Sequence, residues 1–259
     1  MSKLDTSDWQ VPEYNIFEFR KKGTRYCVGI PIINEGERIK KELQEIKPYS
    51  HLADVIIFDG GSTDGSNNKK FLKSQNVRAL LVGPMGQARQ YRFGFSWALK
   101  QGYQGIITID GNHKDDISAI PKFIEALQEG FDYVQASRFI KGGSHKNTPF
   151  YRIFWNRFVI SPVLSLAAGR WYTDTPLAFR GYSKKYLIHP KVKPFRNIFE
   201  RYEHLWYLTI RANQLGFKTK EIPVTRNYPK GEVPTKIVGL RRILDLLNVF
   251  KIAFGLYNP

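Results

Sequence analysis

Short apolar runs of the kind that form strands alternate with helical segments through the first half of this chain, and this alternation restricts the fold more than any other feature. The expected strands cover residues 25–33, 54–59, 77–82, 104–110 and 132–137. The expected helices between and after them cover residues 36–47, 64–75, 87–101 and 116–129. Strands separated by helices of this length form βαβ units, in which the strands are parallel. The sequence therefore predicts an α/β protein with a mainly parallel, twisted sheet flanked by helices.

The second half of the chain has a different pattern. It predicts an aromatic-rich helix interrupted near Ser161-Pro162 and a helix that ends at Gly216. Short strands are expected at residues 177–181 and 218–224. No repeat or low-complexity linker divides the chain, so we expect a surface arm over residues 1–23, one continuous domain over 24–236 and a C-terminal apolar helix over 237–259.

Polar side chains follow the expected strands at the point where each ends. Asn34-Glu35 follow the first strand, Asp59 ends the second, and Asp110 ends the run Ile106–Asp110. Ligands of open α/β sheets bind outside the carboxyl ends of the strands, where these groups would converge. The sequence therefore predicts a nucleotide site whose central carboxylate, Asp110, faces a cation or a phosphate.

A glycine-rich loop follows the second strand, with the sequence Asp59-Gly60-Gly61-Ser62-Thr63-Asp64-Gly65. Its glycines allow the backbone to approach a ligand closely, and Ser62, Thr63 or Asp64 can cap the next helix. Taken alone, this segment is equally typical of an ordinary strand–turn–helix junction.

The charge of the chain predicts an anionic partner. Its 40 Lys and Arg residues against 23 Asp and Glu give a formal net charge of +17, which suits nucleic acid, an acidic membrane surface or phosphorylated substrates. The single cysteine, Cys27, excludes a disulfide framework and a cysteine-based zinc site, and we expect it to be buried. The polar N-terminus and the short or charged apolar runs predict a cytoplasmic protein, with peripheral membrane association left open.

Seven short segments occur in one order along residues 24–236. They are Ile30–Glu35, Asp59–Gly65, Gly86–Arg89 with Gly94 and Ala98, Asp110–Asn112, Ser137–Phe139 with Gly142-Gly143, Asp174–Arg180, and Glu221–Val224 with Arg226. In this order they resemble glycosyltransferase family 2, and within it the polyprenyl-phosphate sugar transferases of the dolichyl-phosphate mannosyltransferase type. The resemblance implies a GT-A fold, which is a Rossmann-like sheet, with a C-terminal extension on the acceptor side. It also implies inverting transfer of a hexose from a nucleotide-diphosphate sugar, UDP- ahead of GDP-, to a polyprenyl phosphate.

The resemblance also implies roles for individual residues. Asp110, Arg138 and Arg226 are expected to be catalytic, and Asp110 with Asn112 is expected to hold Mg²⁺ or Mn²⁺ against the diphosphate. The residues expected to bind donor or acceptor are Pro31, Asn34, Glu35, Asp59, Gly61, Arg89, Gly111, Lys114 and Arg152. Among these, Asp59 suits the ring N–H of uracil or guanine.

This chain departs from the family pattern around Asp110. Asn112 replaces the second carboxylate of the D-x-D motif, and Lys114 stands where a glutamine is common. We expect metal dependence with weak affinity; alternatively, Lys114 contacts the diphosphate and partly replaces the cation. We interpret Asp115 and Asp116 as first-turn charges of the next helix, rather than as a metal ligand or base.

The acceptor decides whether a general base is needed. A phosphate monoester is anionic at neutral pH and can attack unaided, whereas a hydroxyl needs a base, with Asp174, Asp115 or Glu203 as candidates. The sequence leaves open transfer to a hydroxyl of a polysaccharide, lipopolysaccharide or small molecule, and a non-catalytic protein that binds acidic lipid or nucleic acid. No nucleic-acid motif occurs, and a homo-oligomer is left open. The basic residues expected near an acceptor phosphate include Arg157 and Lys230, and the helix near 237–257 suits either packing or an anionic membrane interface.

Overall fold

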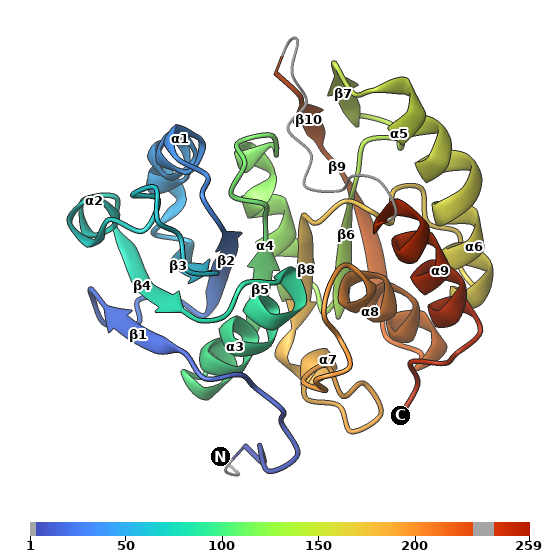
Figure 1. Ribbon diagram of the computed structural model, residues 1–259, viewed down its shortest axis with the longest axis horizontal. Coiled ribbons are helices and arrows are strands. Elements are labelled where there is room, and N and C mark those ends of the chain that lie inside the picture. The colour runs from blue at the N-terminus through green and yellow to red at the C-terminus, as the bar shows by residue number, and fades with distance from the viewer. Residues whose placement is uncertain (1–3, 230–240) are drawn as a thin grey trace.

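A computed structural model describes residues 4–229 and 241–259, and an eight-stranded sheet forms the centre of this part of the chain (Figure 1). The strand order is β1-β4-β3-β2-β5-β8-β6-β9. The strands are β1 Asn15–Glu18, β2 Tyr26–Ile32, β3 Ala53–Asp59, β4 Val77–Val82, β5 Gly105–Thr108, β6 Tyr133–Ser137, β8 Arg180–Ser183 and β9 Thr219–Pro223. β1 and β8 run antiparallel to their neighbours, and the other neighbouring pairs are parallel. The predicted α/β class with a mainly parallel sheet is confirmed.

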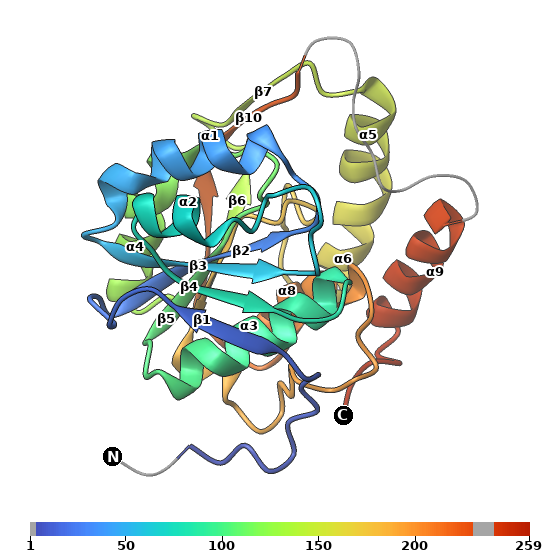
Figure 2. The same cartoon turned by 60° about the vertical axis from the view of Figure 1, so that its left-hand side comes forward.

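Helices cover both faces of the sheet, as Figure 2 shows. They are α1 Glu37–Ile46, α2 Lys69–Ser74, α3 Gln87–Lys100, α4 Ile120–Gln128, α5 Phe150–Trp155, α6 Ser161–Ala168, α7 Lys184–Leu187, α8 Glu203–Gln214 and α9 Arg241–Ala253. Short 3₁₀ turns lie at Lys47–Tyr49 and Ile117–Ala119, and a π-helical turn at Asn156–Ile160 joins α5 to α6. A second, two-stranded parallel sheet pairs β7, Ser144–Lys146, with β10, Thr225–Asn227.

Successive strand residues point to opposite faces and build two hydrophobic cores. One core gathers residues of α1 and α4, and the other gathers residues of α3, α6, α8 and α9. The Phe58 ring fills the space between β3 and α3, where a Cβ on Gly29 or Gly94 would lie 2.3 or 2.5 Å from it. Glycine at these two positions therefore lets the helix approach the sheet closely. Cys27 is buried in this core, as expected.

Three local expectations differ from the structure. The segment expected to be an arm contributes the edge strand β1, which pairs antiparallel with β4; four residues, three of them exposed, carry too weak a pattern to reveal a strand. The helix expected from residue 64 begins only at Lys69, because Asn68, not Ser62–Asp64, is its N-cap and accepts from the Phe71 backbone N–H. The strand expected at 177–181 is instead β8, Arg180–Ser183.

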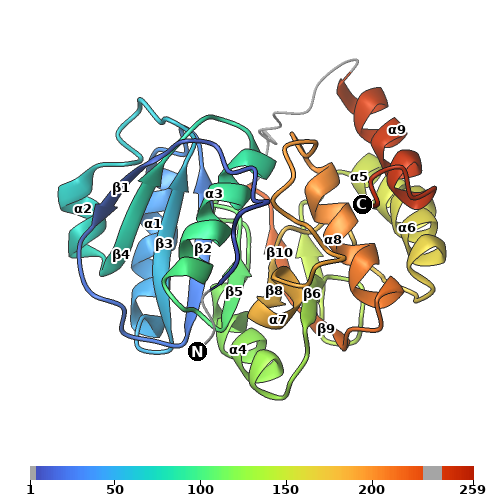
Figure 3. The same ribbon diagram turned by 90° about the horizontal axis from the view of Figure 1, so that it is seen from below.

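The C-terminal helix α9 packs against α6 and α8, and Figure 3 shows the three together at one end of the molecule. Val249 and Ile252 face this core, while Asp245 accepts two hydrogen bonds from Arg201 at 3.0 and 3.1 Å. The first four residues of the expected helix, 237–240, lie outside the described residues. None of the described helices has the length and apolarity needed to cross a bilayer.

Candidate active site

Arg226 joins two carboxylates at the carboxyl edge of the sheet. Its Nη2 lies 3.0 Å from Asp110 Oδ2, and its Nη1 donates to Asp115 Oδ1. Asp115 Oδ2 in turn accepts from the Asp110 backbone N–H at 3.3 Å. Burial alone would lower the pKa of Arg226, but the two carboxylates outweigh it and raise that pKa. The three charged groups therefore form one coupled unit, beside the nucleotide site that the sequence predicts.

The interpretation of Asp115 as a first-turn helix charge is wrong. Its side chain is fully buried, and its backbone forms an isolated antiparallel bridge with Arg226. Burial raises the pKa of Asp115, with the positive charge of Arg226 opposing that shift. Asp116 does lie at the start of the next helical segment, but as the N-cap of the 3₁₀ turn and not as a first-turn charge; its side chain accepts from the Ser118 N–H at 3.1 Å. Neighbours in sequence thus have different roles, because Asp115 bonds Arg226 of β10 and Asp116 bonds Ser118 in the 3₁₀ turn.

Three basic residues that the sequence predicts at the site lie near the ring of Tyr228. Tyr228 itself was not predicted. Lys114 Nζ lies 5.0 Å from the ring centroid, and the guanidinium carbons of Arg152 and Arg226 lie 5.5 and 5.8 Å from it. Arg152 also donates to the Tyr228 hydroxyl at 3.3 Å. Burial alone would raise the pKa of Tyr228, but Arg226, Arg152 and Arg138 together lower it. We call Lys114, Arg152 and Arg226 with Tyr228 the cation cluster; such a group suits phosphate oxygens.

Burial and the arginines of the cation cluster lower the pKa of its lysine, Lys114. Lys114 is almost fully buried, and its burial and the charges of Arg226 and Arg152 lower its pKa. An anion placed beside it would oppose this shift by favouring the charged ammonium. Lys230, another basic residue expected near the acceptor, lies outside the described residues.

Asp110 and Asn112 offer oxygen ligands for a divalent cation. The side chain of Asp110 is partly exposed, and Asn112 Oδ1 is buried with no hydrogen-bond partner among the described residues. A carboxylate and an amide oxygen fit Mg²⁺ or Mn²⁺. No group of three or more His, Cys, Asp and Glu side chains in the described residues could hold an ion by itself. The chemistry of these two oxygens fits such an ion, and their role as metal ligands stays a prediction.

The loop that carries these ligands is tightly packed. Gly111 is buried, and a Cβ there would lie 2.6 Å from the side chain of Ile32. The next turn is held from α1, where the buried Glu42 accepts from the His113 backbone N–H at 2.7 Å. Burial raises the pKa of Glu42 well above its ordinary value. Glu42 therefore helps to hold the metal-ligand loop. The sequence did not indicate this, because Glu42 lies within a helix of ordinary amphipathic pattern.

Asn34 forms two hydrogen bonds with the glycine-rich loop that follows β3. Asn34 Oδ1 accepts from the Thr63 N–H at 2.8 Å, and the Asn34 N–H donates to Ser62 Oγ at 3.0 Å. Asp59 is fully buried and accepts from the Ser62 hydroxyl at 2.6 Å and from the Asn67 amide at 2.8 Å. The structure thus shows Asp59 organising the loop, and its contact with a nucleotide base stays a prediction.

The other residues expected to bind the donor lie around the same strand ends. Pro31 is half-buried in β2, and Gly61 is exposed with φ +89°. Glu35 pairs with Arg38 at 2.8 Å, and Arg89 lies half-buried in the first turn of α3. Their roles as ligands stay predictions.

Arg138 is buried in an ion pair with Asp174. Its Nε and Nη2 donate to the two Asp174 oxygens at 2.7 and 2.9 Å, and the Asn156 amide donates to the same carboxylate at 2.6 Å. Glu203 is also engaged, because it accepts from the backbone N–H groups of two residues just before α8. The acceptor contact expected of Arg138 stays a prediction. In the structure, the ion pair of Arg138 with Asp174 links the end of β6 to the segment before β8.

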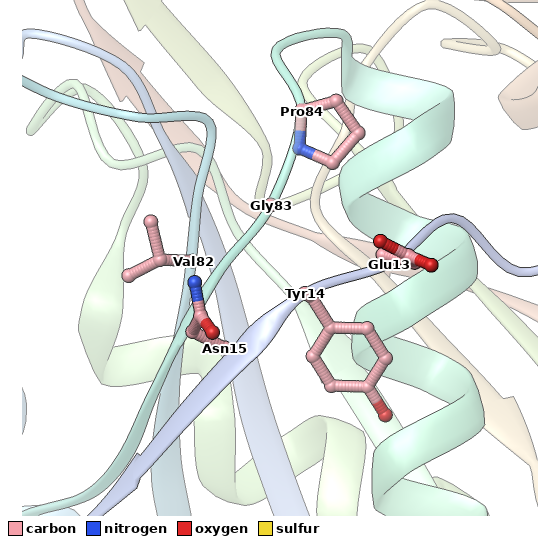
Figure 4. Close-up of a pocket in the computed structure, with 6 residues that line it drawn as sticks. All are labelled: Glu13, Tyr14, Asn15, Val82, Gly83 and Pro84. Atoms are coloured by element: carbon pink, nitrogen blue, oxygen red, sulfur yellow. The ribbon is translucent and has the colours of Figure 1, made fainter.

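Two hollows lie near this edge of the sheet. One of about 510 Å³ is lined by Asp115 and Asp116, with Thr225 and Asn227 on either side of Arg226. The other, of about 700 Å³, lies where the segment leading into β1 passes the end of β4, and its lining includes Tyr14 and Gly83 (Figure 4). No residue predicted as a ligand lines this second hollow.

The family model described as glycosyl transferase family 2 matches residues 27–189, more than half of the chain. The chain belongs to glycosyl transferase family 2. It is therefore a glycosyltransferase, and the resemblance inferred from the seven segments is confirmed.

Two relatives of this family 2 chain have names that describe their activity. It is 24% identical to a polyprenol monophosphomannose synthase of Mycolicibacterium smegmatis, over 78% of this chain and 77% of the relative. It is 25% identical to an undecaprenyl-phosphate mannosyltransferase of Micrococcus luteus, over 83% and 90%.

A solved structure of low sequence identity shares the fold of this family 2 enzyme. It is glucosyl-3-phosphoglycerate synthase from Mycobacterium tuberculosis, in complex with Mn²⁺, UDP and phosphoglyceric acid. The TM-score is 0.64 at 16% identity, and the match covers 88% of this chain and 78% of that chain. The predicted GT-A fold is confirmed.

Proposed function

We propose that this enzyme transfers a hexose from a nucleotide-diphosphate sugar to the phosphate of a polyprenyl phosphate, with inversion at the anomeric carbon. The observation that carries the proposal is the cation cluster, which places Lys114, Arg152 and Arg226 around one ring beside Asp110. Such a concentration of positive charge suits two phosphate-bearing substrates. The names of both mannose-transferring relatives refer to polyprenol or undecaprenyl phosphate chemistry, which supports this acceptor.

The state of the candidate bases favours a phosphate acceptor over a hydroxyl. Asp174 is buried and bound to Arg138, and Asp115 is buried and bound to Arg226. Glu203 is almost fully buried and caps a backbone turn. A general base must come within hydrogen-bond distance of the proton that it removes, and all three carboxylates are shielded from a hydroxyl acceptor. A phosphate acceptor has no proton to lose before it attacks.

The proposed step balances without an added acid or base. A phosphate oxygen of the acceptor attacks the anomeric carbon, and a new C–O bond forms as the bond to the donor diphosphate breaks. The electron pair of the broken bond leaves with the nucleoside diphosphate. In this proposal, Arg226 and Lys114 offset the charge that develops on the leaving group.

The proposal includes a divalent metal, Mg²⁺ or Mn²⁺, bound together with the donor. Asp110 and Asn112 would hold it, and when bound it supplies positive charge to the departing diphosphate. Lys114 and Arg226 supply part of that charge from the protein, which is consistent with the loss of the second carboxylate at Asn112.

The proposal also specifies which nucleotide the donor sugar carries. We place UDP-sugars ahead of GDP-sugars, and the solved neighbour bound to UDP supports this order. The mannose in both relatives' names is the reason to test GDP-mannose alongside them. Because the acceptor is a lipid, the proposal also includes peripheral association with an anionic membrane.

The test is nucleotide release from a panel of UDP- and GDP-sugars, with Mn²⁺ or EDTA, and with or without a short-chain polyprenyl phosphate. We expect release that depends on the metal and is stimulated by the lipid phosphate but not by the matching polyprenol. Stimulation by the alcohol would move the acceptor to a hydroxyl. Nucleotide release that neither the polyprenyl phosphate nor the polyprenol stimulates would rule out a lipid acceptor.

A further inference from the structure

One side of the segment from α5 into the π-helical turn carries a row of exposed aromatic side chains. Its members are Phe150, Tyr151, Phe154, Trp155 and Phe158, which are between 41% and 79% exposed. Their spacing, i, i+1, i+4, i+5 and i+8, places them along one side of a helix. A surface helix ordinarily turns its polar side to solvent, whereas this segment turns an aromatic side to solvent. We call this row the aromatic face.

The opposite side of the same segment reaches the candidate active site. Arg152 donates to the Tyr228 hydroxyl in the cation cluster, and Asn156 donates to Asp174, which holds Arg138. The segment thus lies between the phosphate-binding groups and the surface that carries the aromatic face.

Helix α9 extends the exposed apolar surface. Leu244, Leu247, Phe250 and Phe254 are 54%, 50%, 38% and 80% exposed and recur at helical spacing. α9 packs on α6, and Figures 1 and 2 show α5, α6 and α9 at the same end of the molecule. We call the aromatic face together with these four residues the apolar patch.

The surroundings of the apolar patch are strongly biased in charge. Residues 133–173 contain six lysines and arginines and no Asp or Glu. Residues 246–259 also lack Asp and Glu and include the exposed Lys251. The acidic residue of α9, Asp245, is bound to Arg201. An exposed apolar surface whose segments carry more cations than carboxylates complements an anionic lipid bilayer. A second copy of this chain would bring its own +17 charge against these cations.

We infer that the apolar patch docks the protein on an anionic bilayer, with its aromatic side chains at the level of the lipid headgroups. The inference rests on the proposed function for the identity of the acceptor and adds how that acceptor is reached. Docking through α5 sets the cation cluster, on the other side of the segment, next to the membrane. A lipid phosphate can then meet Arg152 while its chain remains in the bilayer.

The experiment is co-sedimentation of the full chain with vesicles of phosphatidylcholine, with and without phosphatidylglycerol. We expect wild-type protein to bind the anionic vesicles and to be released by salt. The double variant Phe154→Ser/Phe158→Ser should lower the partition coefficient at least about tenfold, since each buried aromatic ring is worth more than the 1.4 kcal/mol of a tenfold change. Phe158→Trp should retain binding. The matched control is Ile16→Ser, an exposed apolar side chain on β1, at the opposite end of the molecule, which should bind like wild type.

Companion measurements separate this inference from the proposed function. Transfer to a short, water-soluble polyprenyl phosphate needs no docking, so the double variant should keep wild-type kcat/KM there. Vesicle binding without any transfer would reject the proposed function and leave the docking surface in place. Transfer to the soluble acceptor by a protein that ignores anionic vesicles would overturn the docking surface. So would a dimer in sedimentation velocity that the double variant abolishes, because a second copy would then cover the patch.

Discussion

An ion pair of 3.0 Å joins Arg226 on β10 to Asp110 in the loop after β5, across 116 positions of sequence. The same guanidinium holds the buried Asp115, so two carboxylates that would repel one another share one cation. Removing the cation leaves Asp115 buried without a counter-charge.

Replacing Arg226 with methionine should therefore lower the free energy of unfolding by about 3–5 kcal/mol, which is the usual cost of leaving a buried charge unpaired. Urea unfolding of the purified variant measures this. The double variant Arg226→Met/Asp115→Asn should recover much of the stability while remaining inactive. A single variant within about 0.5 kcal/mol of wild type would mean that the pair is not buried in solution.

Replacing Asp110 with asparagine should lower kcat/KM at least about 100-fold, the scale expected when a group that stabilises transition-state charge is lost. The measurement is nucleotide release at saturating Mn²⁺. Asp116→Asn is the matched control, because asparagine is an equally good cap and the Asp116 side chain bonds Ser118 in the 3₁₀ turn and not Arg226. Wild-type kcat/KM in the Asp110 variant would remove it from the reaction.

Tyr228 should act on acceptor binding through the cations that it holds. Tyr228→Phe removes the hydroxyl bonded to Arg152 and keeps the ring, so KM for the acceptor should rise about 2- to 10-fold with kcat unchanged. Tyr228→Leu also removes the ring that Lys114 and Arg226 face, and should raise KM further. Equal effects of the two substitutions would show that the ring contributes nothing.

His204 should make the protein less stable in acid. Its burial among aromatic rings, aided by the charge of Arg92, lowers its pKa from 6.5 to about 3. The unfolded chain takes up a proton below pH 6.5 and the folded chain does not, so stability falls as the pH falls from about 6.5 towards 3, by up to about 1.4 kcal/mol per pH unit.

His204→Gln keeps a donor for the Pro194 carbonyl, which lies 3.0 Å from the imidazole Nε2. It should remove this slope from the pH dependence of unfolding, and the exposed His51→Gln should leave the slope as it is. An unchanged slope in the His204 variant would assign the acid sensitivity to other groups.

Much of the sheet could be predicted because the period of a strand or helix is written in local sequence. The strands near 25–33, 54–59 and 77–82 are mostly apolar, and the structure places all three inside the sheet. β1 escaped prediction because an edge strand with one side in solvent needs little apolar pattern. The helix expected from residue 64 began late because Asp64 bonds the Ser66 N–H and holds the loop open until Asn68.

By itself, the sequence determined the α/β class, most of the parallel strands, the family, and the place of Asp110 just after a strand. Each of these depends on residues close together in sequence or on a fixed order of short segments. Only the tertiary structure decided that Asp115 is a buried partner of Arg226, that Tyr228 gathers three cations, and that the aromatics of α5 face outward. Contacts across more than a hundred positions and the direction in which a helix turns its apolar side depend on how the elements pack, which no local pattern records.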